Sequence, residues 1–204
     1  MNMSVINIVM VAVGGQGNLL ALKILGEAAL QSGVKVHISE IHGLAQRGGI
    51  VESSVVLGDA RSAVVPDGRA DVLLGMEPLE TLRALGKCHS NSLVITTTSP
   101  LEPYAVSVGH SAYPSLEEVR SAVLKKTKRL VMIDALSLAL EAGNPKAVNT
   151  VLLGKLIKTA SLPLTYQSAR KAVRKAVRKN MLEVNLTAFD LGYFDDQHRQ
   201  KTGT

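Results

Sequence analysis

The sequence predicts a single α/β domain of three layers, with a mixed, largely parallel sheet and a helical C-terminal region. Three observations support this fold class. Short apolar runs rich in β-branched residues alternate with segments of helical periodicity, as in βαβ units. The pattern after Pro145 is mostly helical, and no linker divides the 204 residues, a length suited to one hydrophobic core. We expect the domain to occupy residues 1–190 and a flexible tail to occupy residues 191–204.

The chain opens with a strand, a turn and a helix. Residues 4–13 form a continuous apolar run that is typical of a strand buried on both faces. A glycine turn over residues 14–17 follows, and apolar residues then recur at helical spacing over residues 18–32 until Gly33 ends the helix. A second strand over residues 34–39 completes a βαβ unit, which predicts a parallel pair with a right-handed crossover.

Strands and helices continue to alternate through the middle of the chain. Further strands are predicted at residues 51–57, 70–75, 92–97, 104–108 and 130–133. Helices are predicted at residues 77–85, 115–126, 135–142, 149–160 and 168–180. The start signals of three helices are Pro78 in a first turn, a capping box of Ser115 with Glu118, and Asp134 as an N-cap.

The excess positive charge is concentrated in one predicted helix. The net charge is +6, from 23 basic and 17 acidic residues, and a window without acids holds Arg170, Lys171, Arg174, Lys175, Arg178 and Lys179. The opposite face is apolar, so the cationic face is first of all a solvated one. It could also dock on an acidic partner or steer an anionic ligand. Nucleic acid ranks last, because no Trp, two Phe and four Tyr offer little base stacking.

Composition also bounds the cofactors and the compartment. Cys88 is the single cysteine, so it forms no internal disulfide and cannot alone hold an iron–sulfur cluster or a cysteine zinc site. The five histidines lack metal-ligand spacing, so we expect no metal site. No disulfide, signal-peptide pattern or apolar stretch of membrane-spanning length is indicated, so we expect a cytoplasmic protein.

A candidate cofactor-binding loop follows the first strand. It comprises Gly14, Gly15, Gln16, Gly17 and Asn18. Glycines there permit a tight turn, and the N–H groups of a helix N-terminus favour anions. The third glycine of a dinucleotide fingerprint is replaced by Leu20, while Glu40 could mimic its ribose acceptor. A dinucleotide, another anion and a tight turn without a ligand therefore remain three interpretations.

A second glycine-rich segment, residues 39–49, follows the second strand. Its polar members offer a carboxylate, an imidazole, an amide and a guanidinium from Glu40, His42, Gln46 and Arg47. Its glycines, which permit positive φ or close approach, are Gly43, Gly48 and Gly49. A polar loop on a rigid strand is a typical place for binding chemistry, although an ordinary solvated turn has the same composition.

The chain has no Gly-x-Ser-x-Gly, Walker or His-Glu-x-x-His motif, which favours a subunit of a larger assembly.

Three motifs in order resemble one known family. They are Val13-Gly14-Gly15-Gln16-Gly17, the segment Ser39–Gly49 with its His-Gly-Leu-Ala-Gln-Arg-Gly-Gly sequence, and Pro66–Pro78. Together they are similar to the gamma-type module of the 2-oxoacid:ferredoxin oxidoreductases, and most similar to the small (beta) subunit of the indolepyruvate ferredoxin oxidoreductases. The resemblance covers roughly residues 5–185, and Asn149–Gly154 also fits the pattern.

The resemblance implies a fold of the gamma-domain type and a role within a complex. Such a complex oxidatively decarboxylates a 2-oxoacid, in this branch an aryl pyruvate such as indolepyruvate, transfers the acyl group to the co-substrate coenzyme A and passes electrons to ferredoxin. Thiamine diphosphate and [4Fe-4S] clusters are expected on a larger partner subunit, so this chain alone holds no cofactor. The resemblance makes Arg47 the catalytic candidate with Gln46 in support, because a guanidinium pairs with carboxylate or phosphate oxygens.

The resemblance also assigns the cofactor-facing residues, which are Gly14, Gly15, Gln16, Gly17, Asn18, His42, Gly43, Gly48 and Gly49. Two alternatives stay open. One is a stand-alone Rossmann-like nucleotide- or anion-binding module using Gly15, Gly17 and Glu40, and the other is a regulatory or scaffolding protein that has lost its partner. Neither nucleic acid nor a membrane is an expected partner. The isolated chain could form a homodimer through apolar surface meant for a partner.

Overall fold

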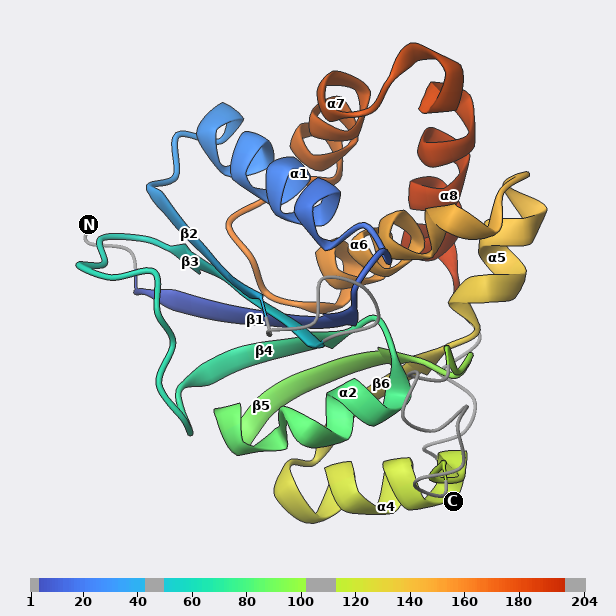
Figure 1. Cartoon of the computed structure of the whole chain (residues 1–204). Coiled ribbons are helices and arrows are strands. Elements are labelled where there is room, and N and C mark those ends of the chain that lie inside the picture. The colour runs from blue at the N-terminus through green and yellow to red at the C-terminus, as the bar shows by residue number, and fades with distance from the viewer. Residues whose placement is uncertain (1–3, 43–49, 102–112, 197–204) are drawn as a thin grey trace.

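The computed structural model of the chain describes residues 4–42, 50–101 and 113–196 (Figure 1). Over these residues a six-stranded sheet has the order β2-β3-β1-β4-β5-β6. The strands are β1 (Ile6–Val13), β2 (Val36–His42), β3 (Ile50–Leu57), β4 (Ala70–Gly75), β5 (Cys88–Thr97) and β6 (Arg129–Ile133). The helices are α1 (Asn18–Gln31), α2 (Pro78–Arg83), α4 (Leu116–Lys126), α5 (Ala135–Glu141), α6 (Val148–Thr159), α7 (Tyr166–Ala176) and α8 (Leu182–Phe194), with 3₁₀ turns η1 (Leu85–Lys87), η2 (Pro145–Ala147) and η3 (Lys179–Met181).

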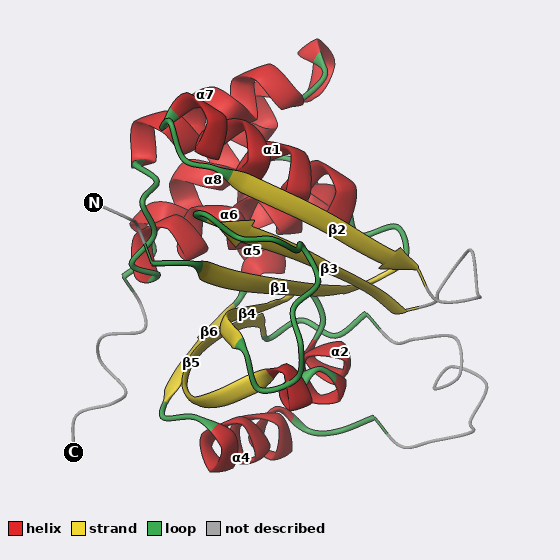
Figure 2. Ribbon diagram, turned by 90° about the vertical axis from the view of Figure 1, so that its left-hand side faces the viewer, coloured by secondary structure: helices red, strands yellow, loops and turns green. Residues whose placement is uncertain are grey.

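Helices cover both faces of the sheet, which confirms the three-layer architecture. One face carries α1, α5, α6, α7 and α8, and the other carries α2 and α4 (Figures 1 and 2). Side chains of β1 alternate between the layers. Ile8 and Met10 join the larger core with residues of α1 and α6, while Val9 and Val11 join a smaller core with Val123 of α4. Both faces of β1 are therefore buried, as its continuous apolar sequence predicted.

The sheet is mixed and largely parallel, as predicted. β1, β4, β5 and β6 pair in parallel, whereas β3 is antiparallel to both β1 and β2. The predicted parallel pair of the first two strands is wrong, because β3 lies between them and β2 forms the edge. The hairpin partner that follows β2 in sequence pairs with it over its whole length, from Val36↔Leu57 to His42↔Val51. A sequence pattern identifies strands, but it does not specify their order in the sheet.

The predicted helix start signals are confirmed. Ser115 accepts a hydrogen bond from the Glu118 backbone N–H, and the Glu118 carboxylate accepts one from the Ser115 backbone N–H. The Asp134 carboxylate caps α5 by accepting from the Ser137 N–H at 3.1 Å. Pro78 occupies the first turn of α2, where its missing N–H costs no hydrogen bond. Local polar chemistry therefore sets where these helices begin.

The C-terminal helices differ from the prediction. The helix predicted at residues 168–180 begins earlier, at Tyr166, and ends at Ala176, where the chain turns extended before η3. The sequence pattern does not indicate α8 as a separate helix, because apolar and polar residues alternate over residues 182–188 and do not recur at helical spacing. The expected domain boundary at residue 190 falls within α8, which continues to Phe194. The predicted strand at residues 104–108 and the end of the expected tail, residues 197–204, lie outside the described residues.

Close backbone contact joins α6 to α8. A Cβ atom added to Gly154 would lie 2.1 Å from the Phe189 carbonyl oxygen, and one added to Gly192 would lie 2.0 Å from the Val151 carbonyl oxygen. Only glycine fits at either position, since backbone cannot yield to a methyl group. The two helices thus form a tight pair above the sheet, and α6 presents its N-terminus to the edge described next (Figure 1).

Candidate functional site at the carboxyl edge of the parallel strands

The carboxyl ends of β1 and β4 form the switch point of the sheet. The chain leaves β1 into α1 on one face, and it leaves the neighbouring β4 into α2 on the other face (Figures 1 and 2). Connections that depart to opposite faces open a crevice between adjacent strands, where open α/β sheets bind their ligands. This edge is therefore the place where the fold itself favours a binding site.

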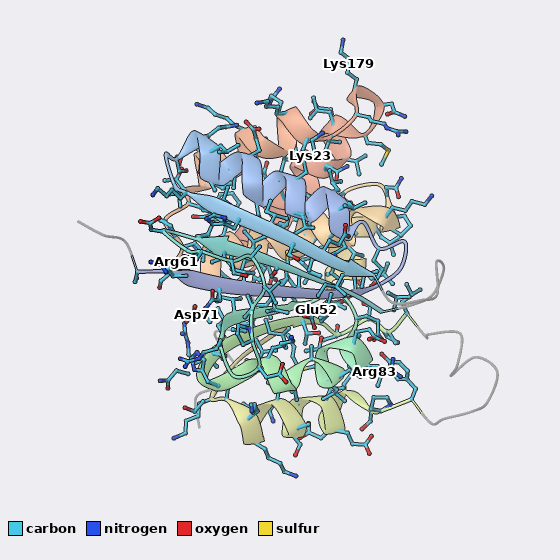
Figure 3. All side chains as sticks on the ribbon, turned by 60° about the vertical axis from the view of Figure 1, so that its left-hand side comes forward. Lys23, Glu52, Arg61, Asp71, Arg83 and Lys179 are labelled. Carbon is cyan, nitrogen blue, oxygen red and sulfur yellow. The ribbon has the colours of Figure 1, made fainter. Side chains whose placement is uncertain are left out.

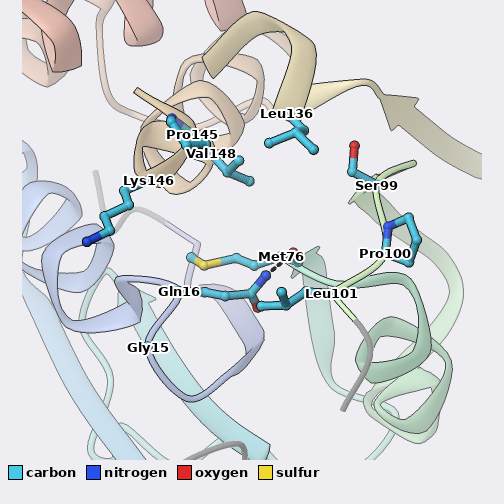
Figure 4. Close-up of a pocket in the computed structure, with 10 residues that line it drawn as sticks. All are labelled: Gly15, Gln16, Met76, Ser99, Pro100, Leu101, Leu136, Pro145, Lys146 and Val148. Carbon is cyan, nitrogen blue, oxygen red and sulfur yellow. Dashed lines mark hydrogen bonds between the residues drawn. The ribbon is translucent and has the colours of Figure 1, made fainter. Parts of the chain in front are cut away.

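A cavity of about 270 Å³ lies at this edge (Figure 4). Its walls come from the loops after β1, β4 and β5 and from the starts of α5 and α6. The lining residues are Gly15, Gln16, Met76, Ser99, Pro100, Leu101, Leu136, Pro145, Lys146 and Val148. Most of these side chains are apolar, and Lys146 supplies the charge among the lining residues that the structure describes. A mostly apolar cavity with one cation suits an organic molecule that carries an anionic group.

Gln16 closes the crevice between β1 and β4. Its Oε1 accepts from the Val13 N–H at 2.8 Å, and its Nε2 donates to the Met76 carbonyl at 2.9 Å (Figure 4). The amide thus joins the ends of the two strands and satisfies their backbone groups. One donor and one acceptor of the side chain are used in this way, so its first role is to shape the cavity wall.

Gly15 and Gly17 both have positive φ, at 101° and 80°, but they face different surroundings. A Cβ atom added to Gly15 would meet nothing within 4 Å, whereas one added to Gly17 would lie 2.4 Å from Asn149 Nδ2. Gly15 therefore presents bare backbone to open space beside the cavity, as close approach of a ligand requires. Gly17 instead permits close packing of the loop against α6. Gly14, which precedes both, is half-buried.

Asn18 begins α1 and directs its side chain away from the cavity. The residue is buried, and its Nδ2 donates to the Ser53 hydroxyl of β3. Its Oδ1 has no hydrogen-bond partner among the residues that the structure describes. Of the five residues proposed in this loop, Gly15 and Gln16 line the cavity, while Gly17 and Asn18 contact neighbouring elements of the protein.

The second predicted loop is attached to the same edge of the sheet. β2 ends at His42, which pairs with Val51, and β3 begins at Ile50, which pairs with Val13 at the end of β1. The β3 end of residues 43–49 therefore lies beside the glycine turn, and the β2 end lies one strand farther along the same edge of the sheet. The remaining proposed residues of this loop, Gly43, Gln46, Arg47, Gly48 and Gly49, lie outside the described residues.

The structure does not place the acidic residue of the dinucleotide interpretation beside β1. A dinucleotide fingerprint places a carboxylate at the end of the strand adjacent to β1. Glu40 belongs to β2, and β3 separates that strand from β1. Two strand spacings of about 4.8 Å each put β2 about 10 Å from β1, which is one spacing farther than the fingerprint allows. The loop geometry is thus compatible with an anion or another organic ligand, but not with the ribose contact of that fingerprint.

Sequence reasoning missed the cavity residues that come from other loops. Met76 follows β4, Ser99 and Leu101 follow β5, and Lys146 lies in η2 (Figure 4). Each of these residues lies just after a strand or at the start of a helix. That position was the sequence feature that could have indicated them. Asn144 orients η2 by accepting a hydrogen bond from the Lys146 N–H at 2.9 Å. The exposed Lys146 side chain thereby stands at the rim of the cavity.

Two buried acids on α2 also escaped the sequence patterns. Glu77 is fully buried, and its carboxylate accepts from the Glu80 N–H at 2.8 Å and from the Tyr113 hydroxyl. Glu80 is 1% exposed and contacts Arg83 at 2.6 Å. Burial raises the pKa of Glu80, while the Arg83 guanidinium opposes this rise. These contacts fix the start of α2, which directly follows Met76 of the cavity lining.

The basic helix is partly neutralised within the fold. Arg170 makes a two-point contact with Asp190, at 2.9 and 3.0 Å, and Lys175 pairs with Glu27 of α1 at 2.8 Å. Lys171 and Arg174 are exposed and have no ion pair with any residue that the structure describes. Lys179 in η3 and Lys23 in α1 lie on the same side of the molecule (Figure 3). This arrangement supports a solvated cationic face remote from the cavity lining.

Cys88 is a buried packing residue at the start of β5. Burial raises the pKa of its thiol, although a hydrogen bond with Ser92 acts in the opposite direction.

Among the residues that the structure describes, no group of three or more His, Cys, Asp or Glu side chains could hold a metal ion. Within the same ranges, none of the helices has the length and apolarity needed to span a bilayer.

Comparison with known proteins identifies the family. Residues 7–194 match the family model described as pyruvate ferredoxin/flavodoxin oxidoreductase. The chain belongs to this family. The match includes both loops at the carboxyl edge and continues through α8, so it covers the whole architecture described above.

Within the pyruvate ferredoxin/flavodoxin oxidoreductase family, similarity is unequal. Indolepyruvate oxidoreductase subunit IorB from Pyrococcus horikoshii is 43% identical over 188 residues, which cover 91% of this chain and 93% of the relative. The pyruvate/ketoisovalerate oxidoreductases common subunit gamma from Pyrococcus abyssi is 27% identical over 178 residues, with 86% and 88% covered. The crystal structure of a keto/oxoacid ferredoxin oxidoreductase gamma subunit from Geobacter sulfurreducens has the same fold, with a TM-score of 0.68 at 22% identity over 92% of this chain and 96% of that one.

Proposed function

We propose that this chain is the small, gamma-type subunit of a 2-oxoacid:ferredoxin oxidoreductase that acts on indolepyruvate or a similar aryl pyruvate. The observation that carries the proposal is the contrast in similarity. Identity to an indolepyruvate oxidoreductase subunit is 43%, whereas identity to a pyruvate/ketoisovalerate gamma subunit is 27%. Both alignments cover most of the chain, so the difference reflects the branch of the family and not the extent of the match.

The chain contributes to catalysis within a complex and is not sufficient alone. One buried cysteine with a raised thiol pKa does not suit a [4Fe-4S] cluster, which takes four thiolates. We therefore place the clusters and thiamine diphosphate on a larger partner subunit. That partner's cofactors supply decarboxylation and electron transfer, ferredoxin accepts the electrons, and this chain helps position the co-substrate coenzyme A. The complex would work in the cytoplasm.

The carboxyl edge is the part of this chain that we assign to the active site. Gly15 presents open backbone there, Lys146 adds a cation at the rim, and the cavity between them is largely apolar. This combination suits coenzyme A, which joins a long neutral arm to phosphate groups. His42 ends β2, the edge strand on this side of the sheet, and Arg47 with Gln46 would contact carboxylate or phosphate oxygens from the loop that follows.

Co-expression with the candidate large subunit under anaerobic conditions tests the function. The purified complex should reduce a viologen dye in the presence of coenzyme A and indolepyruvate or phenylpyruvate, with a clearly lower kcat/KM for pyruvate. Neither subunit alone should show this activity. A complex that prefers pyruvate would overturn the branch assignment. Failure to bind any thiamine-dependent partner, together with tight NAD binding by the chain alone, would instead establish the stand-alone nucleotide-binding module.

Arg47 is tested in the same complex. Arg47→Ala should lower turnover by several-fold or more, since a charged hydrogen bond contributes about 1.5–3 kcal/mol. Arg61→Ala is a suitable control, because Arg61 is an exposed arginine near the opposite, amino edge of the sheet (Figure 3). Equal rates and Michaelis constants for Arg47→Ala and wild type would remove Arg47 from the site. Gln46→Ala should show a smaller effect in the same direction.

The edge strand β2 supports contact with another subunit. Ile38 and Ile41 are 42% and 54% exposed on this strand. Exposed apolar side chains on an edge strand favour association with another chain. We expect the isolated chain to form a homodimer that dissociates when the partner subunit binds. Light scattering of the chain before and after addition of the partner distinguishes a dimer from a monomer.

A further inference from the structure

The side chain of Asn149 connects α6 to the glycine turn. Its Nδ2 donates to the Gly17 carbonyl at 2.9 Å, across 132 positions of sequence. The same carbonyl accepts the first hydrogen bonds of α1, from the N–H groups of Leu20 and Ala21. Asn149 is 2% exposed, and Gly17 has no room for a Cβ beside it. The Asn149 amide therefore holds in place the carbonyl that accepts the first backbone hydrogen bonds of α1, and we call this contact the clamp.

The clamp continues as a buried polar chain toward the C-terminal helix. Asn149 Oδ1 accepts from the Thr150 N–H at 2.8 Å, and the Thr150 hydroxyl donates to Asn185 Oδ1 of α8 at 2.7 Å. Asn185 Nδ2 in turn donates to the Met181 carbonyl at 2.8 Å. Thr150 and Asn185 are both buried. A buried network whose members are paired specifies one geometry, because any displacement leaves a polar group without a partner.

The position of this network ties it to the cavity. Val148, which precedes Asn149, lines the cavity on one side, and Gly15, two residues before Gly17, lines it on the other. Gln16 holds the strand ends between them. The glycine turn is thus held at Gln16 by β1 and β4 and at Gly17 by α6, which leaves Gly15 as its open face.

We infer that Asn149 is a positioning residue that fixes the glycine turn for ligand binding, with Thr150 and Asn185 as its support. The inference about ligand affinity rests on the proposed function, in which this edge contacts coenzyme A. The clamping itself is a property of the chain alone. The α6–α8 pair therefore does more than cover the sheet. The buried hydrogen bonds that run from Asn185 through Thr150 to Asn149 fix the backbone of the glycine turn.

Hydrogen exchange of the full-length chain tests the clamp. Asn149→Ala removes the side-chain hydrogen bonds to Gly17 and Thr150, while Asn149→Asp keeps the acceptor toward Thr150 and places an oxygen against the Gly17 carbonyl. Both should speed exchange of the Leu20 and Ala21 amides by about tenfold or more relative to amides in β4. Thr127→Val is the matched control, since it removes a buried hydroxyl that donates to the Ser90 and Ser92 carbonyls at the other edge.

Thr150→Val provides a milder second variant should loss of Asn149 prevent folding. It preserves side-chain shape and removes the link to Asn185, so it should speed the same amides to a smaller extent. Exchange in the Asn149 and Thr150 variants that rises uniformly, as in Thr127→Val, would overturn the clamp. A rise confined to the start of α1 would support it.

Kinetics of the reconstituted complex test the functional consequence separately. Asn149→Ala should raise the KM for coenzyme A about fivefold or more while kcat and the KM for the 2-oxoacid change less than about twofold. Thr127→Val should leave all three unchanged. Local exchange that rises without a change in the KM for coenzyme A would support the clamp and overturn the proposed ligand contact. A shift in KM without local exchange would overturn the clamp as its cause.

Discussion

Lys155 of α6 and Asp195, the residue after α8, form a buried ion pair. The Lys155 Nζ lies 2.8 Å from Asp195 Oδ2, and the two side chains are 6% and 8% exposed. The same ammonium donates to the Asp195 backbone carbonyl. The end of α8 is thereby tied to α6, the helix whose first turn holds the glycine turn through Asn149. Contacts near the C-terminus therefore support the geometry of the carboxyl edge.

Breaking this pair should destabilise the fold strongly. Lys155→Met leaves the Asp195 carboxylate buried without its cation, and loss of one partner of a buried pair costs roughly 3–5 kcal/mol. The free energy of unfolding in urea measures the effect. Lys175→Met is a matched control, because Lys175 is 68% exposed in its pair with Glu27 and its loss should change stability little. Equal effects of the two substitutions would contradict a structural role for the buried pair.

The α6–α8 contact should tolerate no added methyl group. Gly154→Ala and Gly192→Ala each place a Cβ against backbone, and overpacking of this kind costs about 3 kcal/mol or more. Gly86→Ala offers the control, since a Cβ there meets nothing within 4 Å. Thermal unfolding should show large losses for the first two variants and little change for the third. A near-neutral Gly154→Ala would mean that the helices can separate without loss of packing.

The two glycines of the turn should respond differently to alanine. Gly17→Ala combines positive φ with a clash against Asn149, whereas Gly15→Ala carries only the backbone strain of about 1–3 kcal/mol. We expect Gly17→Ala to be the less stable variant in urea. Gly15→Ala should remain folded in the complex but raise the KM for coenzyme A, because its methyl group enters the open face. An unchanged KM would place the ligand elsewhere.

Stability should depend on pH through Glu80. Burial raises its pKa above the ordinary value of 4.5, so the folded chain binds this proton more tightly than the unfolded chain. The resulting stabilisation is complete below the unfolded pKa and is lost as pH rises through the folded pKa. Relative to Glu80→Gln, wild type should therefore lose stability in urea unfolding as the pH rises above the ordinary glutamate pKa of 4.5 and through the raised pKa of Glu80. Parallel pH curves for the two proteins would contradict this assignment.

The local features of the fold were predictable because their causes are local. A continuous β-branched run identified β1, and the side chains of Ser115 and Asp134 marked the helix starts that they cap. The resemblance carried by the three motifs in order identified the family that the comparison with known proteins then showed. At the candidate site, Gly15 and Gln16 of the predicted loop line the cavity, and their contact with a ligand stays a prediction.

Other features required the tertiary structure because they depend on contacts between distant segments. Strand order is one example, since the insertion of β3 beside β1 moved Glu40 away from the glycine turn. The cavity is another, because Met76, Leu101 and Lys146 meet only after the strands align.

The sequence by itself therefore determined the fold class, most elements and the family of this protein. Periodicity and capping are encoded within a few neighbouring residues, and the motifs are read directly from the chain. Only the tertiary structure decided which glycine faces open space and which packs on Asn149, because that choice depends on an α6 side chain 132 positions away. The same physical reason separates Gly15, which faces open space beside the cavity, from Gly17, which packs within the protein.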